Sequence, residues 1–234
     1  MIDQFIDKRA YQDLPEVSNF LNAGQIAAFN ADGYLVLRGV LGGEEVRPLR
    51  LACDRLFANT EGEWVSAPEK QEPELRAYAE GHLVRNVIGD LNGSSDVLLG
   101  FLYRKQNTSQ VVKQWHQDAA YWDMSDARVM ALFTPMTPIT RTNGAICVIP
   151  GSHRLGRLFH RAAPNYNLVC DTAAFREPRV VELAPGDVMA LHSFTLHCSP
   201  VNPTAETRIN FGLHFYNRQT RIVRDAASAA IYAP

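Results

Sequence analysis

The segment RINFGLHFY, residues 208–216, alternates between polar or small residues and large apolar residues. Successive side chains of a β-strand point to opposite faces, so this segment is expected to form a strand with two chemically different faces. One face carries Arg208, Asn210, Gly212, His214 and Tyr216, and the other carries Ile209, Phe211, Leu213 and Phe215. Such a strand separates a packed layer from a polar interior.

The polar face of this strand is also expected to lie beside His197. If His197 ends one strand and Arg208 opens the next after the turn SPVNPTAET, an antiparallel pair places both residues on one face. A buried guanidinium needs an anion. If the protein offers none nearby, a bound ligand must bring a carboxylate, which an arginine can grip through two parallel hydrogen bonds.

From about residue 97 onward, short β-type runs are separated by turn signals such as TNG, PGS and PGD. The preceding part is more helical. Residues 22–33 and 44–58 show helical patterns, whereas residues 75–91 are ambiguous between helix and strand. We therefore predict a mainly β fold, a sandwich or jelly roll, with helices on its outside.

No internal repeat or low-complexity linker interrupts the chain, which predicts a single domain over residues 1–234. Within it, we expect an N-terminal helical segment at about 20–60 and a β core at about 97–217. Hydrophobic residues make up 46% of the sequence, enough for a sizeable core.

Composition excludes several classes of partner. Lys plus Arg (23) nearly balances Asp plus Glu (25), so neither nucleic acid nor an anionic membrane is expected to bind. No stretch approaches the roughly 18 apolar residues of a membrane span, and the first residues lack the apolar block of a signal peptide. The four cysteines are isolated, which argues against a thiolate zinc site and fits a reducing cytoplasm.

The stretch WHQDA places His116 and Asp118 two residues apart. On a strand both side chains share one face, about 7 Å apart along the chain, and can lean onto a cation between them. Such a triplet often arises by chance, but His197 completes a set of two histidines and one carboxylate, the facial triad of non-haem Fe(II) oxygenases. Zinc is the rival metal, although the helical H-E-x-x-H pattern is absent.

Four motifs occur in order: IAAFNADGYLVLRGVLGGEEV, WHQDAAYW, NGAICVIPGSH, and PGDVMALHSFTLHCSPVN followed by Arg208. Over roughly residues 20 to 217, they resemble the phytanoyl-CoA dioxygenase family of Fe(II)/2-oxoglutarate oxygenases. The resemblance implies a double-stranded β-helix core, of the jelly-roll or cupin-like type. It also implies bound Fe(II), with 2-oxoglutarate and O₂ as co-substrates.

The resemblance further implies a set of site residues. His116, Asp118 and His197 would be the iron ligands and the catalytic residues. Arg208, Ser199 and Tyr121 would contact the co-substrate, and Trp122 would contact the substrate. In the same alignment Tyr103 and Lys105 alternate inward with His116, which makes Tyr103 a second candidate substrate contact.

Other histidines receive structural interpretations. His192 and Cys198 fall on the face opposite His197 if their strands are regular, and His153 is expected to brace a turn. His214 shares the face of Arg208, where it either lines a pocket or satisfies a polar group of the core.

The leading functional hypothesis is an oxygenase that hydroxylates or otherwise oxidises an unactivated C–H bond of a small apolar or aromatic metabolite. Desaturation, epoxidation or ring closure would use the same residues, whereas the carboxylate of Asp118 argues against halogenation. The alternatives are a cupin-like metal-dependent hydrolase or isomerase, and a non-catalytic small-molecule binding module. The expected partner is a small molecule bound by a monomer or a small homo-oligomer.

Overall fold

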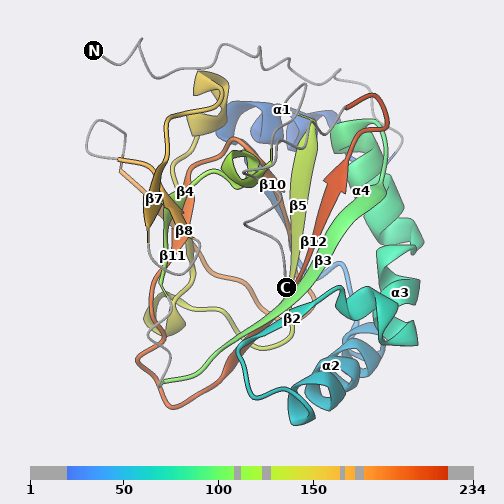
Figure 1. Ribbon diagram of the computed structural model, residues 1–234. Coiled ribbons are helices and arrows are strands. Elements are labelled where there is room, and N and C mark those ends of the chain that lie inside the picture. The colour runs from blue at the N-terminus through green and yellow to red at the C-terminus, as the bar shows by residue number, and fades with distance from the viewer. Residues whose placement is uncertain (1–19, 108–111, 123–127, 164–166, 172–176, 221–234) are drawn as a thin grey trace.

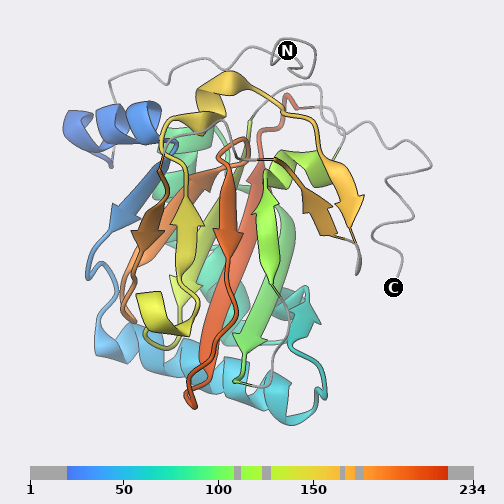
Figure 2. The ribbon, with the colours of Figure 1, turned by 90° about the vertical axis from the view of Figure 1, so that its left-hand side faces the viewer.

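Two β-sheets face each other, and helices pack on the outer side of the larger sheet (Figure 1; Figure 2). The computed structural model describes residues 20–107, 112–122, 128–163, 167–171 and 177–220. The mainly β fold with flanking helices is therefore confirmed. No helix within these ranges is long and apolar enough to cross a membrane.

Helix α1 (Ala23–Asp32) forms where the sequence predicts it, and strand β1 (Tyr34–Leu37) follows directly. The Asn22 side chain accepts a hydrogen bond from the backbone of Gln25, and the Gln25 side chain accepts one from the backbone of Asn22. This capping box fixes the start of α1. Gly33 ends the helix with a φ of 78°, a left-handed conformation that glycine adopts without strain.

The remaining helices lie between β1 and the main strands. They are α2 (Gly43–Ala58), the 3₁₀ turn η2 (Pro68–Lys70), α3 (Pro73–Ala79) and α4 (His82–Asn92), and the short strand β2 (Trp64–Ser66) precedes η2. The segment that was ambiguous in the sequence is thus two helices. Its apolar residues are buried beneath the larger sheet, so tertiary packing selects the helical form.

The larger sheet has six antiparallel strands in the order β1-β10-β5-β12-β3-β2. Its main strands are β3 (Asp96–Lys105), β5 (Val129–Pro135), β10 (Val188–His192) and β12 (Arg208–Tyr216). Because β1 and β2 also belong to this sheet, the sheet begins well before residue 97, the expected start of the β core.

The smaller sheet has four strands in the order β4-β11-β6-β9. These are β4 (Lys113–His116), β11 (His197–Ser199), β6 (Ile146–Val148) and β9 (Arg179–Val181). A two-stranded sheet of β7 (Arg161–Ala163) and β8 (Asn167–Val169) lies beside it. The 3₁₀ turns are η3 (Asp118–Tyr121), η4 (Arg141–Asn143) and η5 (Ser152–Leu155).

The predicted antiparallel pairing of His197 with Arg208 is wrong. His197 on β11 pairs with β4 and β6 in the smaller sheet, whereas Arg208 on β12 lies opposite Lys105 of β3 in the larger sheet. The chain crosses from one sheet to the other between the two residues. Alternation fixes which face a side chain takes but not which strands pair, and the two inner faces look at each other across the fold.

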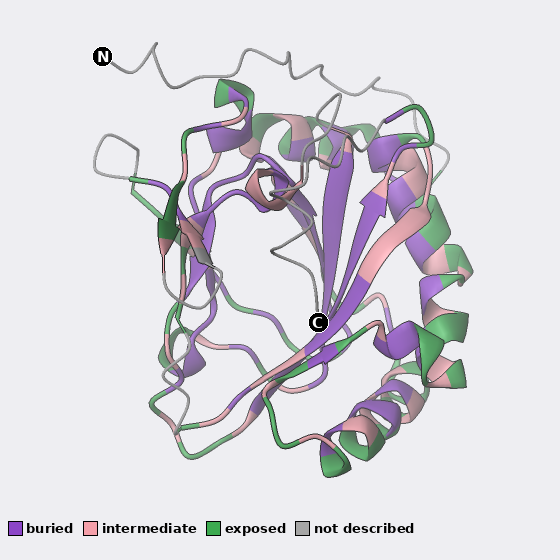
Figure 3. Ribbon diagram, viewed as in Figure 1, coloured by how far each residue is buried: buried purple, intermediate pink, exposed green. Residues whose placement is uncertain are grey.

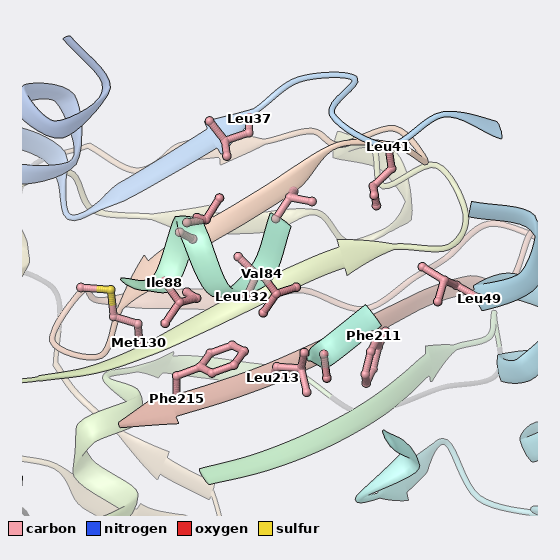
Figure 4. Packing of buried hydrophobic residues seen from close by; sticks show 14 of the residues in the cluster. Leu37, Leu41, Leu49, Val84, Ile88, Met130, Leu132, Phe211, Leu213 and Phe215 are labelled. Carbon is pink, nitrogen blue, oxygen red and sulfur yellow. The ribbon is translucent and has the colours of Figure 1, made fainter. Parts of the chain in front are cut away.

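The two faces of β12 differ as predicted. Its apolar residues are buried among side chains of the helices, in a cluster that includes Leu49, Val84 and Ile88 (Figure 3; Figure 4). Phe211 and Phe215 are almost fully buried there. The polar face of the same strand looks toward the smaller sheet, and this places Arg208 and His214 in the interior.

Candidate metal centre and co-substrate site

His116 and His197 face each other because they are register partners in the antiparallel pair of β4 and β11. Their ring centroids are 4.2 Å apart. Nδ1 of His116 is 2.6 Å from the backbone carbonyl oxygen of Gln114, and Nδ1 of His197 is 2.9 Å from that of Thr195. A carbonyl only accepts, so each Nδ1 carries the proton and each Nε2 keeps its lone pair.

Asp118 lies near both rings, but it is not on a strand, contrary to the expectation from the sequence. Strand β4 ends at His116, and Asp118 begins the 3₁₀ turn η3. Its Oδ1 is 3.5 Å from Nε2 of His116 and 3.5 Å from Nε2 of His197. One ligand atom from each of the three residues therefore falls within 4.8 Å of the others.

The fully buried side chain of Gln117, between the first two candidate ligands, fixes this turn. Its amide nitrogen donates to the carbonyls of Gly156 (2.8 Å) and Phe194 (2.7 Å), and its amide oxygen accepts from the backbone N–H of Leu158 (2.8 Å). Sequence reasoning missed this role. A polar residue between two candidate ligands was the available signal.

The protonation states suit a cation. Burial, together with the neighbouring His116, lowers the pKa of His197 to about 4, so this imidazole is neutral near pH 7. Burial alone would raise the pKa of Asp118, but the neighbouring His197 and His214 hold it well below its usual range. One nitrogen of each imidazole and a carboxylate oxygen therefore converge, and this donor set fits a divalent iron or zinc ion.

His214 accounts for the second carboxylate oxygen. Its Nε2 is 3.1 Å from Oδ2 of Asp118. The ring lies on the inward face of β12, with its centroid 4.7 Å from that of Trp122 and 5.1 Å from that of Phe101. Of the two roles considered for His214, the structure shows both: it lines the cavity and it bonds a buried polar group.

Arg208 and Lys105 form a second group, which we call the anion clamp, around the hydroxyl of Ser199. The Arg208 guanidinium donates to Oγ of Ser199 (2.8 Å) and to the carbonyl of Gly144 (2.5 Å). The Lys105 ammonium donates to Oγ of Ser199 (2.8 Å), to its carbonyl (2.7 Å) and to the carbonyl of Pro200.

Both cations of the clamp are buried. Arg208 is 4% exposed and Lys105 is 0% exposed, and neither forms an ion pair within the described ranges. Nε of Arg208 has no hydrogen-bond partner there. Burial lowers the pKa of Arg208 to about 10 and that of Lys105 to about 7. This uncompensated charge fits an anionic ligand. The sequence did not indicate that Lys105 belongs to this group, which only the packing of the side chains shows.

A cavity joins the candidate ligands to Ser199 and Arg208. Its volume of about 610 Å³ lies in the usual range of roughly 300–1,000 Å³ for small-molecule sites. Each predicted site residue lines this cavity: His116, Asp118, Tyr121, Trp122, Tyr103, His197, Ser199 and Arg208. Its apolar wall comes from Trp64, Leu99, Phe101, Trp122, Phe133 and Ile146. Trp64 is 42% exposed and stacks on Phe101, with 5.0 Å between ring centroids.

The two tyrosines predicted to face the site differ in their bonding. The Tyr121 ring lies edge-on to His116, and its hydroxyl accepts a hydrogen bond from the backbone N–H of Leu168 (3.2 Å). The hydroxyl of Tyr103 is buried and has no hydrogen-bond partner in the described part of the chain. The structure therefore places both rings at the cavity, and directs the Tyr121 hydroxyl toward strand β8.

The histidines interpreted as structural lie away from the cavity lining. His192 is buried with its ring centroid 5.4 Å from that of His153, and burial lowers the pKa of His192 to about 3. His153 lies on the first turn of η5, with Nε2 3.2 Å from the carbonyl of Asn30. Cys198 lies opposite Cys147 of β6.

Residues 81–210 match the family described as phytanoyl-CoA dioxygenase. The chain is 30% identical to the ectoine dioxygenase of Sphingopyxis alaskensis over 154 residues, which is 57% of this chain and 50% of that protein. It spans about half the length of the curated relatives that it matches.

Among solved structures, the apo form of EctD from S. alaskensis superposes with a TM-score of 0.77 at 23% identity, over 92% of this chain and 85% of that one. The non-haem α-ketoglutarate-dependent carbocyclase SnoK from nogalamycin biosynthesis has a TM-score of 0.73 at 18% identity, over 90% and 91% of the two chains. These likenesses establish the fold. The family match, which covers more than half of the chain, shows that the chain belongs to the phytanoyl-CoA dioxygenase family of Fe(II)/2-oxoglutarate oxygenases.

Proposed function

We propose that this protein is an Fe(II)/2-oxoglutarate-dependent oxygenase that hydroxylates, or otherwise oxidises, an unactivated C–H bond of a small apolar or aromatic molecule. One observation carries the proposal: a converging set of two imidazole nitrogens and one carboxylate oxygen shares a cavity with an arginine that has no acid partner in the described ranges. A cation would be bound by the three candidate ligands, and the carboxylate of a ligand would neutralise the charge of Arg208.

His116, Asp118 and His197 would hold the iron. Two histidines and one carboxylate would leave positions on the ion open for a chelating co-substrate and O₂. Bound iron would supply the oxidation of the C–H bond by O₂, with 2-oxoglutarate converted to succinate and CO₂. The protein fixes the tautomer of each imidazole through the carbonyls of Gln114 and Thr195, so the nitrogens are oriented before the metal arrives.

Arg208 would bind the distal carboxylate of 2-oxoglutarate. Its Nε is the buried donor that has no partner in the described chain, and Ser199 holds the guanidinium through the terminal nitrogen. Lys105 adds a second positive charge directly behind Ser199. A dicarboxylate could thus be held at one end by this charge while its keto acid end faces the three ligands.

The apolar wall of the cavity supports an apolar or aromatic substrate. Phe101 and Trp122 pack against His214, beside the candidate ligands, and Trp64 lies at the exposed side. Rings of this kind exclude water and hold a flat or hydrophobic molecule by contact area. Hydroxylation, desaturation, epoxidation and ring closure would all use this arrangement, and both a dioxygenase and a carbocyclase share the fold.

The test is succinate release with Fe(II) and 2-oxoglutarate over a panel of apolar and aromatic small molecules, followed by mass spectrometry of the products. We expect one class of molecule to stimulate succinate release above the basal rate, with a product heavier by one oxygen or lighter by two hydrogens. O₂ consumption that never depends on 2-oxoglutarate, with or without substrate, would contradict the proposal. Metal-dependent hydrolysis or isomerisation would then become the leading hypothesis.

A further inference from the structure

We propose that His214 is a positioning residue for the metal centre: it holds one oxygen of Asp118 so that only the other faces the ligating imidazoles. The proposal rests on the proposed function, because it concerns the iron site described above. It assigns a role to a side chain that is not itself among the candidate ligands.

The geometry separates the two carboxylate oxygens of Asp118. Oδ1 is equidistant, at 3.5 Å, from Nε2 of His116 and Nε2 of His197. Oδ2 is 3.1 Å from Nε2 of His214. A carboxylate oxygen accepts, so Nε2 of His214 is the donor in this contact and carries the proton. One oxygen is therefore available to a metal, and the other is occupied by a hydrogen bond.

This division matters for the number of open metal positions. A carboxylate that is free to turn can chelate a metal through both oxygens, and would then take two coordination positions instead of one. With two histidines, this would leave two open positions of six, too few for a chelating keto acid and O₂ together. A donor fixed on Oδ2 keeps the carboxylate monodentate.

The surroundings of His214 show that the donor is held firmly. The residue is 7% exposed, and its ring is packed by Phe101 and by Trp122. It comes from β12 in the larger sheet, whereas the ligating histidines belong to the smaller sheet. The hydrogen bond therefore joins the carboxylate ligand to the opposite sheet, the one that carries Arg208. The β12–β3 register shifts directly after His214, as strands often do beside functional sites.

Two substitutions separate positioning from packing. His214→Phe keeps an aromatic ring against Phe101 and Trp122 but removes the donor. His214→Gln loses the ring but can present an amide N–H near the position of Nε2. We expect Fe(II) affinity of the Phe variant, measured anaerobically without 2-oxoglutarate, to fall about 10- to 100-fold, the usual effect of losing a hydrogen bond to a metal ligand. The Gln variant should recover most of this loss.

Tyr216→Phe is the matched control, because Tyr216 is the next inward residue of β12 and is only half-buried. Its Fe(II) affinity should equal that of the wild type. Fe(II) affinity of His214→Phe within threefold of the wild type would overturn the proposal. A ranking in which the Phe variant binds Fe(II) better than the Gln variant would also overturn it, because aromatic packing would then be the property that matters.

A measurement on the wild-type protein keeps the proposal testable if the variants do not fold. In protein loaded with Zn(II), nitrogen-15 spectra of the imidazoles should show a proton on Nε2 of His214, and protons on Nδ1 alone of His116 and His197. An unprotonated Nε2 on His214 would overturn the proposal. Failure of the wild-type protein to bind any divalent metal would instead overturn the proposed function, so the two failures are distinguishable.

Discussion

The cavity has a histidine-rich end around Asp118 and a cationic end around Ser199. At the first end, three imidazoles surround a carboxylate that the protein itself supplies. At the second end, Arg208 and Lys105 converge on a neutral hydroxyl, and neither has a carboxylate partner within the described ranges. Both ends bury basic side chains, but in the part of the chain that the structure describes only the histidine-rich end contains a carboxylate.

This difference predicts what each end binds. Two imidazoles that turn lone pairs toward a carboxylate form a site for a cation. Basic groups around a neutral hydroxyl form a site for an anion, because a buried charge without a counter-ion is unfavourable until a ligand provides one. The buried pair His153 and His192 shows the contrast, since neither residue lines this cavity.

The largest expected effect comes from removing the anion at the histidine-rich end. Asp118→Ala should abolish Fe(II) binding and turnover, and His197→Ala should do the same, because each removes one of three ligands. His192→Gln is the control: it replaces a buried histidine outside the cavity and should change thermal stability but not Fe(II) affinity. Anaerobic Fe(II) titration followed by a succinate assay measures both. Activity retained in His197→Ala would refute the assignment of the metal centre.

The next largest effect should follow from removing a cation at the other end. Arg208→Ala should weaken 2-oxoglutarate binding by roughly 10²- to 10³-fold or more, since losing one partner of a buried charge pair costs about 3–5 kcal/mol. Fe(II) affinity should remain close to that of the wild type. Arg208→Lys should restore binding only in part, because an ammonium cannot make the two-pronged contact.

The measurement for Arg208 is an anaerobic titration of the charge-transfer band of the Fe(II)–keto acid complex. It reports 2-oxoglutarate affinity separately from turnover. An unchanged 2-oxoglutarate affinity in Arg208→Ala would remove this residue from the site. The hydrolase and binding-module hypotheses would then have to be considered again.

Sequence reasoning reached the residues at both ends but not their arrangement. The resemblance in the motifs named the three candidate ligands and Arg208, and alternation placed Arg208 and His214 on one face of a strand. Pairing could not be predicted, because a strand with one polar and one apolar face satisfies many partners equally well. His197 and Arg208 therefore looked like neighbours in one sheet, when they face each other from two.

The supporting residues were harder to predict for a related reason. Gln117, Lys105 and His214 are buried polar residues whose partners lie 39 or more positions away in the chain. Local patterns carry no information on such distant partners. The helices α3 and α4 were ambiguous because their segment is amphipathic in either conformation, and packing beneath the larger sheet decides the outcome.

A smaller effect is expected from pH at the cationic end. Burial lowers the pKa of Lys105 to about 7, and a bound dianion favours the ammonium form, so the pKa is higher in the complex. Affinity for 2-oxoglutarate should therefore be highest below about pH 7 and should fall as the pH rises above this value, by up to about tenfold per pH unit. Arg208, with a pKa of about 10, stays charged over this range.

Anaerobic titrations with 2-oxoglutarate between about pH 6 and 8.5 measure this dependence. The Lys105→Met variant should bind 2-oxoglutarate weakly at every pH, and its affinity should no longer depend on pH in this range. Flat wild-type affinity over this range would mean that Lys105 keeps its proton, held by its three oxygen acceptors, and that its charge does not vary near neutral pH.

The smallest expected effect concerns the neutral hydroxyl that the two cations share. Ser199→Ala removes an acceptor from Arg208 and from Lys105, but each cation keeps a backbone carbonyl partner. We expect 2-oxoglutarate affinity to fall only about fivefold, equivalent to roughly 1 kcal/mol, with Fe(II) affinity unchanged. Ser193→Ala is the matched control, because Oγ of Ser193 is buried and forms no hydrogen bond within the described residues. A loss as large as that of Arg208→Ala would show that Ser199 binds the anion directly, and that the cationic end depends on its hydroxyl as much as on its charges.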